Sequence, residues 1–239
     1  MAHFMKSAER KTAPKQQTLP PLENGDCMDQ KTYHERYEAM PEDTRAELIG
    51  GIVYMASPQK LPHGRTNKNV GRLLDAYEDA TEGTESLAAI TDVLGPDSEP
   101  EPDDCLRILP EFGGQSREDE DGYLIGSPEL VVETGFTTES RDLNQKKADY
   151  EKAGVREYVV VALRSMKVFW FTLRRGKYQE MKPDSDGIYR SKVFPGLWLD
   201  PEALLCRDRK KLLAVLQRGL ASKEHKEFVA ELATKRKHK

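Results

Sequence analysis

Residues 128–163 read PELVVETGFTTESRDLNQKKADYEKAGVREYVVVAL and predict a strand, a helix and a second strand in succession. The run 129–133 is short, mostly apolar and bounded by proline and glycine, which favours a strand. A helix is expected over about 140–153, with Gly154 as its C-cap. The run 158–163 is apolar and β-branched, which is typical of a strand buried on both faces.

The rest of the chain extends this unit into a layered domain. Two apolar runs, 46–49 and 52–55, flank Gly50-Gly51 and predict a β-hairpin. Apolar residues at helical spacing predict a helix over 63–80. The other expected elements are a helical turn over 29–37, strands over 86–94 and 104–109, a polar loop over 110–127, a hairpin over 167–173 and 177–181, and a helix over about 209–232. This order indicates an α/β or α+β fold with a mixed central sheet flanked by helices.

Length and composition indicate one domain with polar ends. The chain has 239 residues, of which 37% are hydrophobic and 33% are charged, and no apolar run is long enough to span a bilayer. We expect a disordered tail over 1–28, the main domain over 29–205 and a basic helical extension over 206–239. The first 17 residues lack the apolar run of a secretory signal, so a cytoplasmic location is expected. Three widely spaced cysteines favour neither disulfides nor a zinc site.

Charge is distributed unevenly along the chain. Residues 97–121 contain ten acidic and two basic residues, whereas residues 207–239 contain eleven basic and four acidic residues. The basic end could contact nucleic acid, or it could be a solvated helix with a frayed end. The acidic stretch would repel a polyanion unless a metal ion were bound there.

Two carboxylates at strand ends are the candidate chemistry. Asp103 opens one expected strand and Glu133 ends the next, so the two could hold a hard cation such as Mg²⁺ with the carbonyl of Thr134 as a third ligand. Lys146 shares a helix face with Leu143 and Tyr150 and could orient a water or stabilise developing charge. The alternatives are exposed acids at strand ends and, for Lys146, a solvated helix face.

Several motifs in the right order resemble the Uma2 family of restriction-endonuclease-like proteins with the PD-(D/E)XK fold. They are AELIGGIVYMASP at 46–58 with HGR at 63–65, EPD at 101–103, PELVVE at 128–133, and RD, K146, Y150 and AGVREY within 141–158. The resemblance spans about residues 29–205. It implies that Glu47 borders the metal site and that Asp103 and Glu133 bind metal.

The resemblance also implies a role for a helix lysine. The third position of the D/E-x-K pattern is Gly135, which has no side chain to contribute. A lysine from the following helix is then required, and helical spacing allows either Lys146 or Lys147. The resemblance assigns the role to Lys146.

The function that we predict is hydrolysis of DNA phosphodiester bonds by a Mg²⁺-dependent endonuclease, with Mn²⁺ as the alternative metal. The expected catalytic residues are Glu47, Asp103, Glu133 and Lys146, with DNA as the partner and a homodimer as one arrangement that the fold allows. A catalytically inactive module that binds DNA or protein is the alternative class. Hydrolysis of RNA or a nucleotide is a third option. The recognition sequence cannot be read from the chain.

Overall fold

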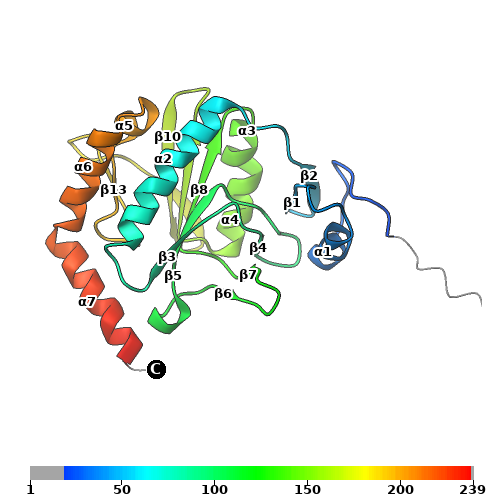
Figure 1. Ribbon diagram of the computed structural model, residues 1–239, viewed down its shortest axis with the longest axis horizontal. Helices are drawn as coiled ribbons and strands as arrows, with labels where there is room; N and C mark the ends of the chain where they lie inside the picture. Colours follow the sequence, from blue (N-terminus) through cyan, green and yellow to red (C-terminus); the bar gives the residue numbers. More distant parts are fainter. Residues whose placement is uncertain (1–18, 238–239) are drawn as a thin grey trace, which may run out of the picture.

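A mixed sheet forms the centre of the protein, as predicted, and it has six strands. The structure is a computed structural model and describes residues 19–237 (Figure 1). The strand order is β11-β10-β9-β8-β5-β3, in which only β8 and β9 are parallel neighbours. The strands are β3 (Thr84–Ala88), β5 (Asp104–Ile108), β8 (Leu130–Gly135), β9 (Glu157–Ala162), β10 (Lys167–Arg174) and β11 (Lys177–Met181).

Helices cover both faces of this sheet (Figure 1). Alternation along β8 sends Leu130 and Val132 toward a core formed with α2, α5, α6 and α7, and sends Val131 toward a second core formed with Tyr150 of α4. These helices are α2 (Leu61–Glu78), α4 (Lys147–Ala153), α5 (Pro201–Leu205), α6 (Arg209–Leu220) and α7 (Lys223–Lys237). Within residues 19–237, none of the helices combines the length and the apolar character that crossing a membrane requires.

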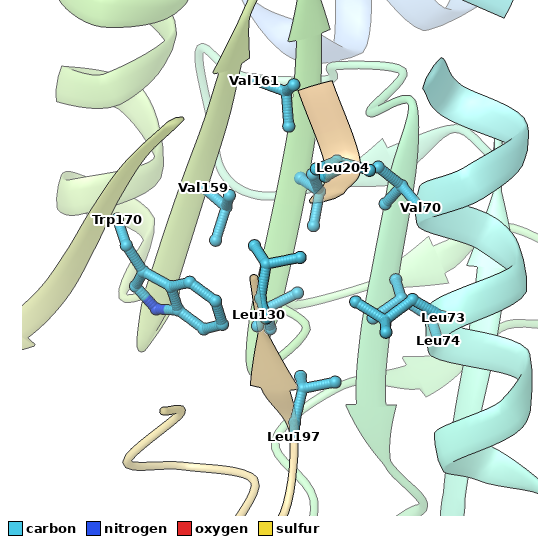
Figure 2. Close-up of a pocket in the computed structure, with 11 residues that line it drawn as sticks. Val70, Leu73, Leu74, Leu130, Val159, Val161, Trp170, Leu197 and Leu204 are labelled. Atoms are coloured by element: carbon cyan, nitrogen blue, oxygen red, sulfur yellow. The ribbon is translucent and has the colours of Figure 1, made fainter. Parts of the chain in front are cut away.

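The larger core contains a small gap in its packing. Figure 2 shows apolar side chains of α2 facing those of the sheet and of the segment that carries Leu197 and Leu204. The gap has a volume of about 20 Å³ and an entirely apolar lining. A cavity of this size has room for about one water molecule but offers it no polar partner. It is therefore a feature of packing and not a ligand site.

The segment between β8 and β9 contains a π-turn that the sequence did not predict. It begins as α3 (Glu139–Arg141), widens to the π-helix η2 (Asp142–Lys146) and continues as α4. A π-turn adds one residue to the ring closed by each hydrogen bond, and such turns occur often at functional sites.

The N-terminal hairpin lies beside the main sheet. Its strands, β1 (Ala46–Ile49) and β2 (Ile52–Met55), have the predicted bounds and pack on α1 (Gln30–Glu38). Residues 1–18 of the predicted tail lie outside the described residues. The remainder is packed: Leu22 is buried, and the Gly25 N–H donates a hydrogen bond to the Val53 carbonyl.

Three expectations about elements were wrong. The strand expected over 86–94 ends at Ala88, because Ala89 turns with φ +50° and β4 (Asp92–Val93) joins a separate sheet. The expected loop over 110–127 contains the 3₁₀ helix η1 (Pro110–Phe112) and two short strands, β6 (Arg117–Glu118) and β7 (Leu124–Ile125). The last helix is divided into α6 and α7. Two short strands, β12 (Tyr189–Arg190) and β13 (Trp198–Leu199), form a further hairpin.

Glu157 makes the stability of this fold depend on pH. Its buried carboxylate accepts hydrogen bonds from Ser191 Oγ at 2.6 Å and the Lys192 N–H at 2.7 Å. Burial raises its pKa to about 7 from an ordinary 4.5, although these hydrogen bonds oppose the rise. The folded protein therefore holds a proton that the unfolded chain releases, and the free energy of unfolding falls as pH rises from about 4.5 to about 7.

We expect Glu157→Gln to remove this part of the pH dependence. The fall in the free energy of unfolding between about pH 5 and about pH 8 should then be smaller in the variant than in the wild type by about 3 kcal/mol. The amide can still accept from the Lys192 N–H and donate to Ser191 Oγ. Urea unfolding of both proteins at the two pH values measures the difference. An identical pH dependence in the two proteins would show that Glu157 is ionised throughout.

Candidate active site

Asp103 and Glu133 line one cleft at an end of the central sheet. Asp103 immediately precedes β5, and Glu133 lies in the neighbouring β8. The two segments are tied together, because the Thr134 N–H donates to Asp103 Oδ2 at 2.7 Å. The cleft has a volume of about 320 Å³. The structure thus places the two predicted carboxylates at one site.

Glu47 and Lys146 line the same cleft. Glu47 reaches it from β1, and Lys146 reaches it from the π-turn. Lys146 Nζ lies 2.5 Å from Glu47 Oε2 and 2.9 Å from Glu133 Oε1. The ammonium group therefore bridges two carboxylates that are 86 positions apart in the chain. Tyr150 OH donates to the same Glu133 oxygen at 2.8 Å.

Lys146 and Lys147 are adjacent in the chain but lie in different environments. The side chain of Lys146 is only 4% exposed, whereas Lys147 points away from the cleft and places Nζ 4.2 Å from the ring centroid of Phe171. The sequence allowed either lysine to serve the site. The structure brings Lys146, and not Lys147, to the carboxylates.

Burial and the charges of neighbouring carboxylates raise the pKa values of three carboxyl groups in the cleft, those of Asp103, Glu133 and Asp142. Burial raises the pKa of Asp103 to about 6, and the charges of Glu47 and Glu101 add to the effect. Burial likewise raises the pKa of Asp142 to about 6, and it raises that of Glu133 well above its ordinary range. Burial alone would lower the pKa of Lys146, but the nearby carboxylates outweigh this and raise it. Lys146 is therefore a fixed cation at neutral pH.

His63 contacts Asp103 and the backbone next to Glu133. Its Nδ1 lies 2.8 Å from the Thr134 carbonyl oxygen and its Nε2 lies 3.3 Å from Asp103 Oδ1. Because a carbonyl can only accept, Nδ1 carries a hydrogen. The Asp103 contact then requires a proton on either the imidazole or the carboxyl group. Burial lowers the pKa of His63 and raises that of Asp103, so both shifts favour a proton on Asp103.

Gly135 is explained by the close approach of β8 to the following helix. A Cβ atom at this position would lie 2.4 Å from Asp142 Oδ2 and 3.1 Å from the backbone nitrogen of Glu139. A lysine at the third position of the D/E-x-K pattern would therefore collide with the start of the helix. The helix contributes Lys146 instead.

The cleft has the donors and the charge that a divalent cation requires, although its ligands are not gathered around one point. Within residues 19–237, no three acidic, histidine or cysteine side chains form a ready-made metal-binding group. Mg²⁺ needs fewer, because it is commonly held by one or two carboxylates and several waters. When all of its charged groups are ionised, the lining carries two negative charges in excess, which one divalent ion would balance. The groups are the five carboxylates of Glu47, Glu101, Asp103, Glu133 and Asp142 and the three cations of Arg45, Arg141 and Lys146. Burial raises the pKa of Asp103, Glu133 and Asp142, and a bound cation would favour their ionised forms.

Sequence reasoning missed two members of the site. Asp142 was not selected, although it lies four residues before Lys146 and so shares its side of the helix; its Oδ2 accepts from Thr138 Oγ1 at 2.7 Å. His63 was noted only as the first residue of the HGR motif and was given no role at the site. The signal available for His63 was its position in the motif of 63–65, but nothing local indicated a contact with Thr134, 71 residues away.

The mixed sheet, its flanking helices and a cleft of carboxylates with one buried lysine define a nuclease-like fold. The sequence profile of the Uma2 family, described as "Putative restriction endonuclease", matches residues 32–202, and the chain belongs to that family. A solved structure from Anabaena variabilis ATCC 29413, described as "a putative nuclease belonging to DUF820", is similar with a TM-score of 0.57 and 13% sequence identity. The similarity covers 72% of this chain and 96% of that one. No curated protein matches the chain in sequence.

Proposed function

We propose that this protein is a Mg²⁺-dependent endonuclease that hydrolyses phosphodiester bonds of DNA, with Mn²⁺ as an alternative ion. The observation that carries the proposal is the cleft that Asp103 and Glu133 both line beside a buried lysine, with two more carboxyl groups than basic side chains in its lining. Asp103 and Glu133 would hold the ion, and the second lone pair of the Thr134 carbonyl is a further donor. A divalent ion there supplies Lewis-acid polarisation of the phosphate and neutralises its charge.

Three side chains would have different roles in this reaction. Hydrolysis adds water to phosphorus and breaks the bond to the leaving sugar oxygen, so negative charge grows on the phosphate and the leaving group. Lys146 holds its proton at Nζ, because the surrounding carboxylates raise its pKa, and it therefore stabilises charge and does not act as a base. Glu47 holds this ammonium group 2.5 Å from its Oε2 and so sets its position. His63 Nε2 contacts Asp103 and fixes the direction of that carboxylate.

A nicking assay on supercoiled plasmid tests the proposal. We expect the wild-type protein to nick DNA with Mg²⁺ or Mn²⁺ and to stop when EDTA removes the metal. Glu133→Ala, purified in the same way, controls for contaminating nucleases. Equal nicking by wild type and Glu133→Ala would refute the assigned mechanism.

One observation favours a second candidate, a nuclease-fold module that binds DNA or protein without turnover. Lys146 pairs with both Glu47 and Glu133 and so partly satisfies the carboxylates that a metal would need. Calorimetry distinguishes the candidates: retained DNA or protein binding without any uptake of Mg²⁺ would support the inactive module.

A further inference from the structure

Three exposed basic residues form a stripe on the outer face of α2. They are Arg65, Lys68 and Arg72, whose spacings of three and four residues place them on one side of the helix. The opposite side is buried in the core through Val70 and Leu73. Arg65 and Arg72 are about 10 Å apart along the axis, which is the rise of about three base pairs of duplex DNA.

The stripe continues into a groove at the start of α6. Arg65 lines this groove together with the segment 206–210, which contributes Arg207, Arg209 and Lys210. The groove has a volume of about 520 Å³. Arg209 Nε donates to Asn69 Oδ1 at 3.0 Å and so joins α6 to α2, which lie on the same face of the sheet (Figure 1).

The stripe and the groove together contain six basic side chains, which are Arg65, Lys68, Arg72, Arg207, Arg209 and Lys210. None of the six has an ion-pair partner within residues 19–237, although the net charge of the protein is −4. The one carboxylate in the groove, Asp208, accepts a hydrogen bond from the Lys211 N–H at 3.0 Å and caps α6. A cluster of unpaired cations at this place attracts a polyanion.

Arg207 occupies a backbone position that would suit glycine better. Its φ is +62°, in the left-handed region, and it follows the last turn of α5. The Arg207 N–H donates to the Leu204 carbonyl and the Asp208 N–H to the Ala203 carbonyl, which is the usual way that a glycine closes a helix. An arginine is strained in this backbone conformation, and its guanidinium group lies at the groove. The local fold does not require this side chain.

We propose that the α2 stripe and the groove bind the phosphate backbone of duplex DNA independently of its sequence. This inference rests on the proposed function, because it assigns a place to the DNA that enters the cleft. His63 and Asn67 of α2 line the cleft, and Arg65 projects from the same turn of the helix toward the groove. DNA that leaves the cleft over the first turn of α2 would meet Arg65 first. Arginine and lysine on phosphates supply affinity and leave the choice of sequence to contacts elsewhere.

Fluorescence anisotropy with a short labelled DNA duplex measures the affinity of this surface for DNA. EDTA removes divalent metal ions, so the duplex is not cleaved during the measurement. We expect the triple variant Arg65→Gln, Arg72→Gln, Arg207→Gly to bind at least ~10-fold more weakly, and its slope of log K against log salt to fall by about 2 to 3. The single variant Arg207→Gly should weaken binding several-fold while the midpoint of urea unfolding stays equal or rises, because glycine relieves the strain. Loss of affinity together with loss of stability would overturn this reading of Arg207.

Arg175→Gly is the matched control. Arg175 is also exposed, has φ +53°, and lacks an ion-pair partner in the described part of the chain. It directly follows β10, whose other end lies near Cys206 of the groove. The two ends of this strand are about 23 Å apart, so Arg175 is far from the groove. We expect its DNA affinity to stay within about 2-fold of wild type. Equal weakening by Arg175→Gly and Arg207→Gly would mean a diffuse charge effect and would overturn the proposal.

Labelling of Cys206 gives a second measurement of position. Cys206 lines the groove and Cys27, the other exposed cysteine, does not. Duplex DNA should slow the reaction of Cys206 with a maleimide several-fold and leave Cys27 unchanged. Protection of neither thiol, or protection by single-stranded RNA but not by duplex DNA, would overturn the inference. If the wild type never cleaves DNA but the groove variants lose binding, the proposed function fails and this surface stands.

Discussion

Replacing Lys146 with methionine is expected to lower the free energy of unfolding of the metal-free protein by about 3–5 kcal/mol at neutral pH, and to abolish cleavage of DNA. The ammonium group is the buried partner of both Glu47 and Glu133. Without it two carboxylates remain in the cleft with no cation between them. The loss should shrink as pH falls, because burial raises the pKa of Glu133 and its protonation removes the repulsion. Urea unfolding in EDTA across pH measures the first effect, and plasmid nicking measures the second.

Lys147→Met is the control for this variant. Lys147 lies over the Phe171 ring outside the cleft. Its replacement should therefore lower the free energy of unfolding by at most about 1 kcal/mol and leave cleavage intact. If Lys147→Met abolished cleavage and Lys146→Met did not, the assignment of the helix lysine would be wrong.

Local sequence patterns predicted most of the central layer. The hairpin around Gly50-Gly51, the helix after Pro62 and the strand 157–162 all have strong periodicity or turn chemistry, and each formed close to its expected bounds. The division of the last helix was missed, although Ser222 at the break accepts a hydrogen bond from the His225 N–H at 3.2 Å, as a residue that caps a helix does. The strands within 110–127 were missed because two-residue strands carry almost no periodic signal.

The candidate site was only partly accessible from sequence. The expected strand ends identified Asp103 and Glu133, although β8 continues two residues beyond Glu133, to Gly135. The contact of Lys146 with Glu47 depends on how the hairpin packs, which no local pattern encodes. The π-turn is similarly hidden, since it shifts the helix register by one residue without a distinctive sequence. The clash at Gly135 requires the coordinates of Glu139 and Asp142, so the sequence could show only that the usual lysine was absent.

Removing the carboxylate of Glu133 is the second change with a large expected effect. We expect Glu133→Gln to lower the cleavage rate by at least ~10³-fold, since the amide retains the size of the side chain and loses its charge toward a cation. Asp149→Asn is the control, because Asp149 is also buried but accepts from Ser98 Oγ outside the cleft. Its variant should cleave DNA at a rate close to that of the wild type.

Calorimetric titration with Mn²⁺ and Mg²⁺ tests most directly whether Asp103 and Glu133 hold a metal ion. The wild-type protein should bind a divalent ion, and the double variant Asp103→Asn, Glu133→Gln should bind it at least ~100-fold more weakly while Asp149→Asn binds like the wild type. Binding should also weaken as pH falls below about 6, because the pKa of Asp103 lies there and a protonated carboxyl group is a poor ligand. Equal affinity in the wild type and the double variant would contradict the account.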